Sequence, residues 1–119
     1  MKGPLTDRER IQHIQDAIGE VAVYLTNVTL EQFMANSEKR FATLKQIEII
    51  GEACNRITDE LKQAHTEIAW RPINGFRNIS IHEYFGVNLE LVWEIATNDL
   101  PPLKEQMQLL LEGLNYSKS

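Results

Sequence analysis

The chain has 119 residues, of which 43% are hydrophobic and 24% charged, and its formal net charge is −5. This length suits a single domain over residues 1–119 and is too short for two domains of typical size. The composition is that of a globular protein rather than a disordered one. The negative charge argues against broad nonspecific binding to nucleic acid, because such binding depends on Lys and Arg neutralising phosphates. It remains compatible with a small basic site or a basic partner.

The sequence shows neither a membrane span nor a secretory signal. No apolar run approaches the roughly 20 residues that cross a bilayer, and the residues that follow Met1 lead into a charged stretch. The one cysteine, Cys54, cannot form a disulfide within the chain. We therefore expect a cytoplasmic protein that is not bound to a membrane.

A first helix is predicted from about residue 7 to 26. Thr6 and Glu9 have the spacing of a capping box, in which each side chain bonds to the backbone amide of the other residue. His13 falls at the boundary between the charged and apolar faces, where we expect an ordinary surface residue. Apolar residues recur at helical spacing, at Ile11, Ile14, Ile18, Val21 and Leu25.

A second long helix is predicted over about residues 37–64, after a short turn that Thr29 caps and a start signal at Asn36. Gly51 lies inside this helix at a cost of about 1 kcal/mol relative to alanine, and such a glycine can mark the close approach of another helix. We expect Cys54 to be a buried structural thiol. The apolar stripe consists of Phe41, Leu44, Ile47, Ile50, Cys54, Ile57 and Leu61.

Glu48 and Glu52 lie four residues apart on one face of this helix, where like charges repel mildly. Two interpretations stay open. The pair belongs to a solvated face, or one carboxylate faces the segment with Arg77 and His82 and orients one of those side chains.

A further helix is predicted to begin at about Trp70, with Pro72 in its first turn, and to end near Gly86, which is a natural C-cap. Asn88 then caps the next helix. The pair Pro101-Pro102 predicts a new helix or a kink at about residue 100, because proline suits only the first turn of a helix. The stripe continues through Leu103, Met107, Leu110 and Leu114.

These elements predict an all-α bundle of about five to six helices, with two long antiparallel helices near the front and shorter ones behind. The residues from Asn115 to Ser119, and residues 116–119 above all, are expected to be a frayed tail. The apolar faces are wide for so small a bundle, so a homodimer is a natural way to bury them.

The segment from Gly75 to Gly86 gathers the residue types that carry chemistry. Arg77 presents a planar, permanently charged fork that matches phosphate, and His82 exchanges protons near neutral pH. Together they supply the minimum for metal-free RNA cleavage. The histidine takes the proton of a ribose 2′-OH, which attacks the adjacent phosphorus, and the arginine stabilises the charge on the phosphoryl oxygens.

Regular helical geometry leaves this site incomplete. Asn78 and His82 share a face, but Arg77 and His82 lie about 140° apart at 100° per residue. Arg77 must therefore reach round, or the helix must end before His82, or another chain must complete the site. The acid for the leaving group comes from a dimer mate or from Tyr84. In the alternative without catalysis, these residues only stabilise the fold. Arg77 forms an ion pair, His82 lies at the helix C-terminus, where positive charge is favoured, and Tyr84 lies in the core.

The motif Arg77-Asn78-x-x-x-His82-x-Tyr84 resembles the RN-x-x-x-H-x-Y signature of HEPN-domain proteins, specifically the HepT-like toxin family, also known as DUF86. The resemblance extends from about residue 40 to 104. Asn88 departs from the family pattern, in which this position is an aspartate as often as not. An asparagine caps a helix equally well. The other landmarks are Ile49-Ile50-Gly51-Glu52-Ala53, Trp70-Arg71-x-Ile73-x-Gly75-Phe76, Phe85-Gly86-Val87, Val92-Trp93 and Asp99-Leu100-Pro101-x-Leu103.

The resemblance implies a HEPN-type bundle, usually dimeric, with the two motifs facing a shared cleft. It implies a metal-independent endoribonuclease that acts as the toxin of a type VII-like toxin–antitoxin pair. Arg77 and His82 would be catalytic, with Asn78 and Glu52 in support, and the chain itself would need no metal or cofactor. The partner would be a nucleotidyltransferase (MntA-like) antitoxin that uses ATP to attach AMP to Tyr84. The added bulk and negative charge would then repel the phosphates of RNA.

Other interpretations stay open. A non-catalytic HEPN binding module that partners a nucleotidyltransferase suits the acidic charge better, and a plain structural dimer of helices is a third reading. Glu83, beside His82 but on a different side of the helix, is expected to be solvated rather than to touch the site.

Overall fold

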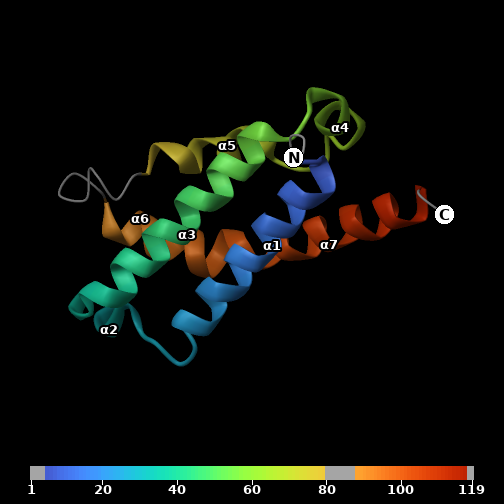
Figure 1. The fold of residues 1–119 in the computed structure, drawn as a ribbon. Helices are drawn as coiled ribbons and strands as arrows, with labels where there is room; N and C mark the ends of the chain where they lie inside the picture. The colour runs from blue at the N-terminus through green and yellow to red at the C-terminus, as the bar shows by residue number, and fades with distance from the viewer. Residues whose placement is uncertain (1–4, 80–87, 118–119) are drawn as a thin grey trace.

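The computed structural model describes residues 5–79 and 88–117, with side chains as far as Leu114. Every regular element within these ranges is helical, as predicted (Figure 1). Three helices are long, namely α1 (Asp7–Tyr24), α3 (Ser37–Arg56) and α7 (Leu100–Ser117). The shorter elements are α2 (Leu30–Ala35), α4 (Asp59–Ala64), α5 (Trp70–Gly75), the 3₁₀-helix η1 (Phe76–Asn78), α6 (Leu89–Glu94) and the π-helical turn η3 (Ile95–Asp99).

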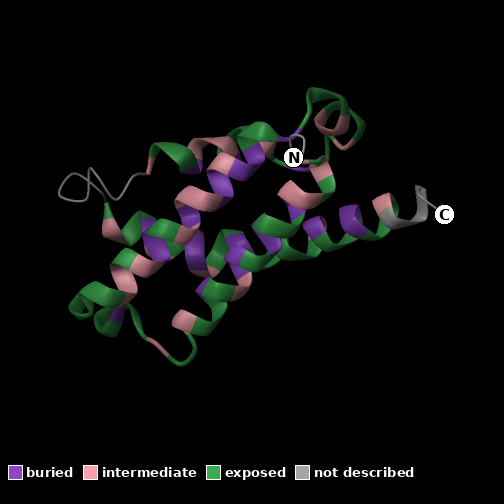
Figure 2. Cartoon of the chain, viewed as in Figure 1, coloured by how far each residue is buried: buried purple, intermediate pink, exposed green. Residues whose placement is uncertain are grey.

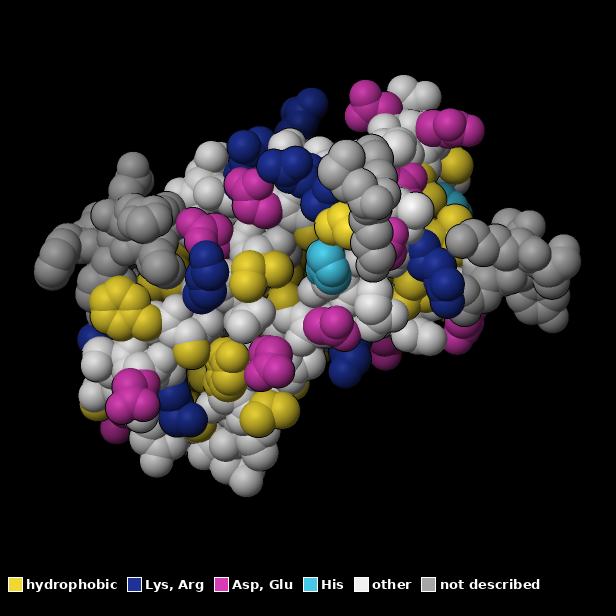
Figure 3. All heavy atoms as spheres, viewed as in Figure 1, with side chains coloured by type: hydrophobic (Ala, Val, Ile, Leu, Met, Phe, Trp, Pro, Cys, Tyr) yellow, Lys and Arg dark blue, Asp and Glu magenta, His cyan; other side chains and the backbone are white. Residues whose placement is uncertain are grey.

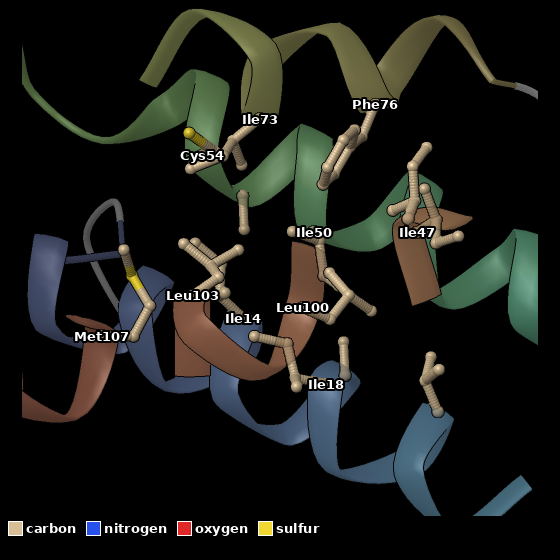
Figure 4. Close-up of a cluster of buried hydrophobic side chains, with 14 of the residues drawn as sticks. Ile14, Ile18, Ile47, Ile50, Cys54, Ile73, Phe76, Leu100, Leu103 and Met107 are labelled. Atoms are coloured by element: carbon tan, nitrogen blue, oxygen red, sulfur yellow. The ribbon is translucent and has the colours of Figure 1, made fainter. Parts of the chain in front are cut away.

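Helices α1 and α3 run antiparallel, as predicted, and make the most extensive contact among the described elements, while α7 packs against α1 (Figure 1). Their buried faces turn toward one another (Figure 2). In the core, Ile14 and Ile18 of α1 meet Ile47 and Ile50 of α3 (Figure 4). Leu100, Leu103 and Met107 of α7 complete this cluster, and Ile73 and Phe76 cover it from the side of α5 and η1.

Local capping starts the first three helices, as predicted. The Thr6 amide donates to Glu9 Oε1 and the Glu9 amide to Thr6 Oγ1, each at 3.1 Å, which is a full capping box. Thr29 forms a second capping box with Gln32 at the start of α2. Asn36 Oδ1 accepts from the Lys39 amide at 3.0 Å and caps α3.

The prediction of one helix over residues 37–64 was wrong, because the chain breaks at Ile57 and Thr58. Ile57 is extended, with φ −67° and ψ 141°, and Thr58 caps the separate helix α4. The carboxylate of Asp7 accepts from the Thr58 amide at 3.0 Å and from its hydroxyl at 2.6 Å. A contact from α1 therefore helps to end α3. The apolar stripe also begins later than predicted, since Phe41 is 41% exposed whereas Leu44 is fully buried.

The helix that carries the motif is shorter than predicted. Pro72 lies in the first turn of α5, as expected, but the chain then tightens into η1 and leaves helical geometry at Ile79, with φ −92° and ψ 89°. The side chains of Ile73 and Phe76 are both 6% exposed, so tertiary packing on α3 holds this segment. The expected end at Gly86 lies outside the described residues.

The predicted interruption near residue 100 is a π-helical turn. Asn88 Oδ1 accepts from the Leu91 amide at 3.1 Å and caps α6, as predicted. The Leu100 amide then bonds to the Ile95 carbonyl five residues earlier. Pro101 and Pro102 follow in the first turn of α7, where their missing N–H groups cost least.

Helix α7 continues as far as Ser117 and so includes the first residues of the predicted tail. The fraying of the last residues stays a prediction. Within the described ranges, no helix has both the length and the hydropathy that crossing a membrane requires.

Candidate active site

The backbone of the motif segment lies directly against α3 at Gly51. A β-carbon added at Gly51 would lie 2.3 Å from the Arg77 nitrogen, 2.8 Å from the Phe76 carbonyl carbon and 2.9 Å from Arg77 Cα. Such distances are far shorter than van der Waals contact, so only glycine permits this packing. The close approach predicted for this glycine is confirmed, and the neighbour is the segment that carries Arg77.

The side chain of Arg77 extends to the next residue of α3. Its Nε lies 3.5 Å from Glu52 Oε1, and the two side chains are 43% and 46% exposed. Water screens an ion pair at this exposure, so the pair adds little to folding stability. Its main physical effect is to limit the directions in which the guanidinium can point.

Glu48 and Glu52 have different partners. The carboxylate of Glu48 lies 3.3 Å from Lys45 Nζ, whereas that of Glu52 contacts Arg77. Of the two interpretations, a carboxylate that faces the motif segment is therefore found at Glu52. That Glu52 supports catalysis stays a prediction.

The other motif residues are described only in part. Asn78 is exposed and ends η1 next to Arg77. His82, Glu83 and Tyr84 lie outside the described residues. Because helical backbone ends before Ile79, angles calculated for a regular helix do not apply between Arg77 and His82. Of the alternatives weighed above, the one in which the helix ends before His82 agrees with the backbone.

Residues of α1 and α3 line a groove that includes Glu52, the partner of Arg77, and this groove was not predicted from the sequence. It is lined by Arg10, His13, Lys45, Glu48, Ile49, Glu52 and Ala53. Spacing along one helix could not reveal it, because two antiparallel helices form it together. On the face shown in Figure 3, several basic side chains of the described residues adjoin one another near the upper edge, and acidic side chains lie beside them and over the rest of the face.

The remaining candidate chemistry in the described part of the chain is structural. Cys54 is fully buried, and its Sγ lies 4.0 Å from the Trp70 carbonyl oxygen. Burial raises the pKa of this thiol from 9.0 to about 11, so it stays protonated at neutral pH and is a poor nucleophile. This confirms the expected structural role. The described residues contain no group of three or more His, Cys, Asp or Glu side chains placed to hold a metal ion.

Comparison of the chain with known proteins identifies its family. The model of a family described as "Ribonuclease HepT-like" matches residues 14–110, which include Gly51, Glu52 and Arg77. The chain is 32% identical over 103 residues to the "Probable ribonuclease HepT" of Thermococcus cleftensis, covering 87% of this chain and 94% of that protein. It is 31% identical over 107 residues to the "Putative RNase TTE0752" of Caldanaerobacter subterraneus, covering 90% and 96%.

A longer relative contains a similar segment. The chain is 33% identical over 109 residues, or 92% of its length, to the "Gamma-glutamylcyclotransferase and putative RNase MJ0434" of Methanocaldococcus jannaschii, and spans 49% of that protein. No solved structure matches the chain. The family model covers most of the chain, and two relatives above 30% identity align over nearly their whole length. The chain therefore belongs to the HepT-like ribonuclease family.

Proposed function

We propose that this protein is a metal-independent endoribonuclease in which Arg77 and His82 carry the reaction. The observation that supports this most strongly is the placement of Arg77. Its backbone lies against Gly51 and its Nε lies 3.5 Å from Glu52, in a chain of a ribonuclease family. A guanidinium that is half exposed and held from one side keeps its other donors available for a phosphate.

The proposed chemistry uses the neighbouring 2′-OH of the RNA as the nucleophile. His82 accepts its proton, the 2′ oxygen bonds to phosphorus and the bond to the 5′ oxygen breaks. Arg77 stabilises the negative charge on the phosphoryl oxygens during this exchange. The products are a 2′,3′-cyclic phosphate and a 5′-hydroxyl. The partner's His82 in a dimer, or Tyr84, supplies the proton for the leaving oxygen.

We further propose that the enzyme is the cytoplasmic toxin of a toxin–antitoxin pair and that a nucleotidyltransferase silences it. The Tyr84 hydroxyl would attack the α-phosphorus of ATP, which forms a phosphodiester to AMP and releases pyrophosphate. The new negative charge would lie seven residues along the chain from Arg77, and it would compete with RNA phosphate for the guanidinium.

Induction of the chain in a bacterial host tests the toxin proposal. We expect growth arrest with fragmented total RNA from the original chain, and neither effect from soluble Arg77→Ala or His82→Ala. Arg71→Ala, which removes an exposed arginine from α5, is the matched control and should still arrest growth. Intact RNA and normal growth with the original chain would contradict the proposal.

Incubation with a purified nucleotidyltransferase of the proposed antitoxin type tests the proposed silencing. With ATP present, we expect the mass of the chain to increase by whole adenylate units and its RNA cleavage to stop. Tyr84→Phe should neither gain mass nor be silenced. Modification that persists in Tyr84→Phe would assign the acceptor to another residue.

A non-catalytic binding module is the second candidate. It is favoured by the net charge of −5, which gives the chain little general attraction for RNA. In that case the chain would bind the nucleotidyltransferase equally well before and after His82→Ala, and neither form would cleave RNA.

A further inference from the structure

Gly51 differs from the other glycines that the structure describes. At Gly19 and Gly75 an added β-carbon would meet no heavy atom within 4 Å, whereas at Gly51 it would lie 2.3 Å from the Arg77 nitrogen. The colliding atoms at Gly51 belong to backbone, namely Arg77 N and Cα and the Phe76 carbonyl carbon. Rotation of a side chain cannot relieve such a collision, so any larger residue must move the segment away from α3.

The segment is also fixed on either side of this contact. Before it, the buried Phe76 side chain anchors η1 in the core. After it, the Arg77 side chain reaches Glu52, which follows Gly51 in α3. Two consecutive residues of α3 thus act on one arginine. Gly51 sets the distance of the Arg77 backbone from α3, and Glu52 limits the direction of its guanidinium.

We propose that Gly51 is a positioning residue for Arg77. The absence of a side chain at Gly51 lets the Phe76–Arg77 peptide lie at the depth from which the guanidinium reaches the scissile phosphate. The catalytic half of this inference rests on the proposed ribonuclease function, whereas the positional half does not. Because displacement of a reacting group by about 1 Å can cost about a hundredfold in rate, a methyl group at Gly51 should reduce catalysis without touching RNA.

The enzymatic test compares Gly51→Ala with two matched controls in the full chain. Gly19→Ala makes the same change in the middle of α1, and Gly75→Ala makes it beside η1. We expect kcat for RNA cleavage to fall about tenfold to a hundredfold in Gly51→Ala while KM changes less than about threefold. Both controls should keep the original kcat. An unchanged kcat in Gly51→Ala, or an equal fall in Gly75→Ala, would overturn the inference.

A structural readout separates this inference from the ribonuclease proposal. We expect the backbone amide and Nε–Hε resonances of Arg77 to shift in Gly51→Ala and to stay in place in Gly19→Ala and Gly75→Ala. If the original chain does not cleave RNA, the ribonuclease proposal fails, and these resonances still decide whether Gly51 positions Arg77. Arg77 resonances that do not move in a folded Gly51→Ala would overturn the inference.

If Gly51→Ala does not fold, a measurement on the original chain tests the close contact between Gly51 and the Arg77 backbone. The short distance between the two backbones predicts a strong nuclear Overhauser effect from the Gly51 α-protons to the Arg77 amide proton. Its absence in the folded original chain would overturn the inference.

Discussion

At the scale of single residues, the contact between Arg77 and Glu52 is important for direction rather than for stability. The pair is separated by 3.5 Å and nearly half exposed, so solvent removes most of its energetic benefit. A fixed guanidinium nevertheless loses less freedom when a phosphate binds, which lowers the cost of reaching the transition state.

The two glutamates of α3 allow a matched test of this role. We expect Glu52→Gln to lower kcat for RNA cleavage about tenfold, since an amide holds the guanidinium less firmly than a carboxylate. The free energy of unfolding should change by less than about 0.5 kcal/mol. Glu48→Gln, which affects the pair with Lys45, should retain full activity. Equal activities for the two variants would contradict an orienting role for Glu52.

The buried thiol of Cys54 leads us to expect that the unfolding free energy of the protein falls in alkaline solution. Burial raises its pKa from 9.0 to about 11, so the folded state binds a proton that the unfolded state releases first. The stabilisation is complete below pH 9 and is lost as the pH rises to about 11. Its size is about 2 to 3 kcal/mol if the whole shift is realised.

The change of unfolding free energy between pH 8 and pH 11, measured with urea, checks this prediction. Cys54→Ala is the comparison, because other groups also titrate in this range. The original chain should lose more stability over the range than Cys54→Ala does. Parallel curves for the two proteins would contradict the prediction.

At the scale of the helices, four caps and the interruption near residue 100 were readable from the sequence, whereas the break between α3 and α4 was not. Thr6, Thr29, Asn36 and Asn88 each bond to an amide three residues later, so the signal and its result lie together in the chain. The end of α3 depends instead on Asp7, which is 51 residues away from Thr58. Apolar spacing that continues through Ile57 concealed the break.

The candidate site was predictable to a similar extent. Its residue types and the glycine of close approach were visible as local patterns. The sequence left open which segment approaches Gly51 and whether a glutamate of α3 reaches Arg77, because both contacts depend on how α5 and η1 lie on α3. The expected helix over residues 70–86 failed for the same reason, since burial of Ile73 and Phe76 controls this segment more than helical periodicity does.

The break between α3 and α4 gives a prediction at this scale. Asp7→Ala removes the acceptor of two hydrogen bonds from Thr58, and we expect a loss of about 1 to 2 kcal/mol in unfolding free energy. Glu20→Ala, an exposed change on the same helix, should cost less than about 0.5 kcal/mol. Urea unfolding of both variants measures the difference. Equal unfolding free energies for the two variants would show that the contact between Asp7 and Thr58 does not stabilise the fold.

At the scale of the whole molecule, four of the exposed large apolar side chains lie at one end of the bundle. They belong to α2, to the beginning of α3 and to α6, which contact one another. Their exposed fractions lie between 38% and 50%, at Leu30, Met34, Phe41 and Leu91. We propose that this end forms the homodimer interface, where burial would recover hydrophobic free energy.

Sedimentation velocity over a range of concentrations tests the proposed dimer. We expect the original chain to be dimeric and a double variant, Phe41→Glu with Leu91→Glu, to be monomeric, because two charges would enter the apolar contact. Leu109→Glu places a charge on α7, where the side chain is 68% exposed, and should leave the dimer intact. An original chain that stays monomeric would contradict the proposal, and dissociation by Leu109→Glu alone would move the interface to α7.

The most direct measurement is cleavage of a defined RNA by the purified chain in excess EDTA, with the product ends identified. We predict fragments that end in a 2′,3′-cyclic phosphate, and a loss of at least about a hundredfold in Arg77→Ala and His82→Ala. Arg71→Ala should cleave as the original does. RNA that stays intact with the folded original chain, or cleavage that survives both motif substitutions, would contradict the account.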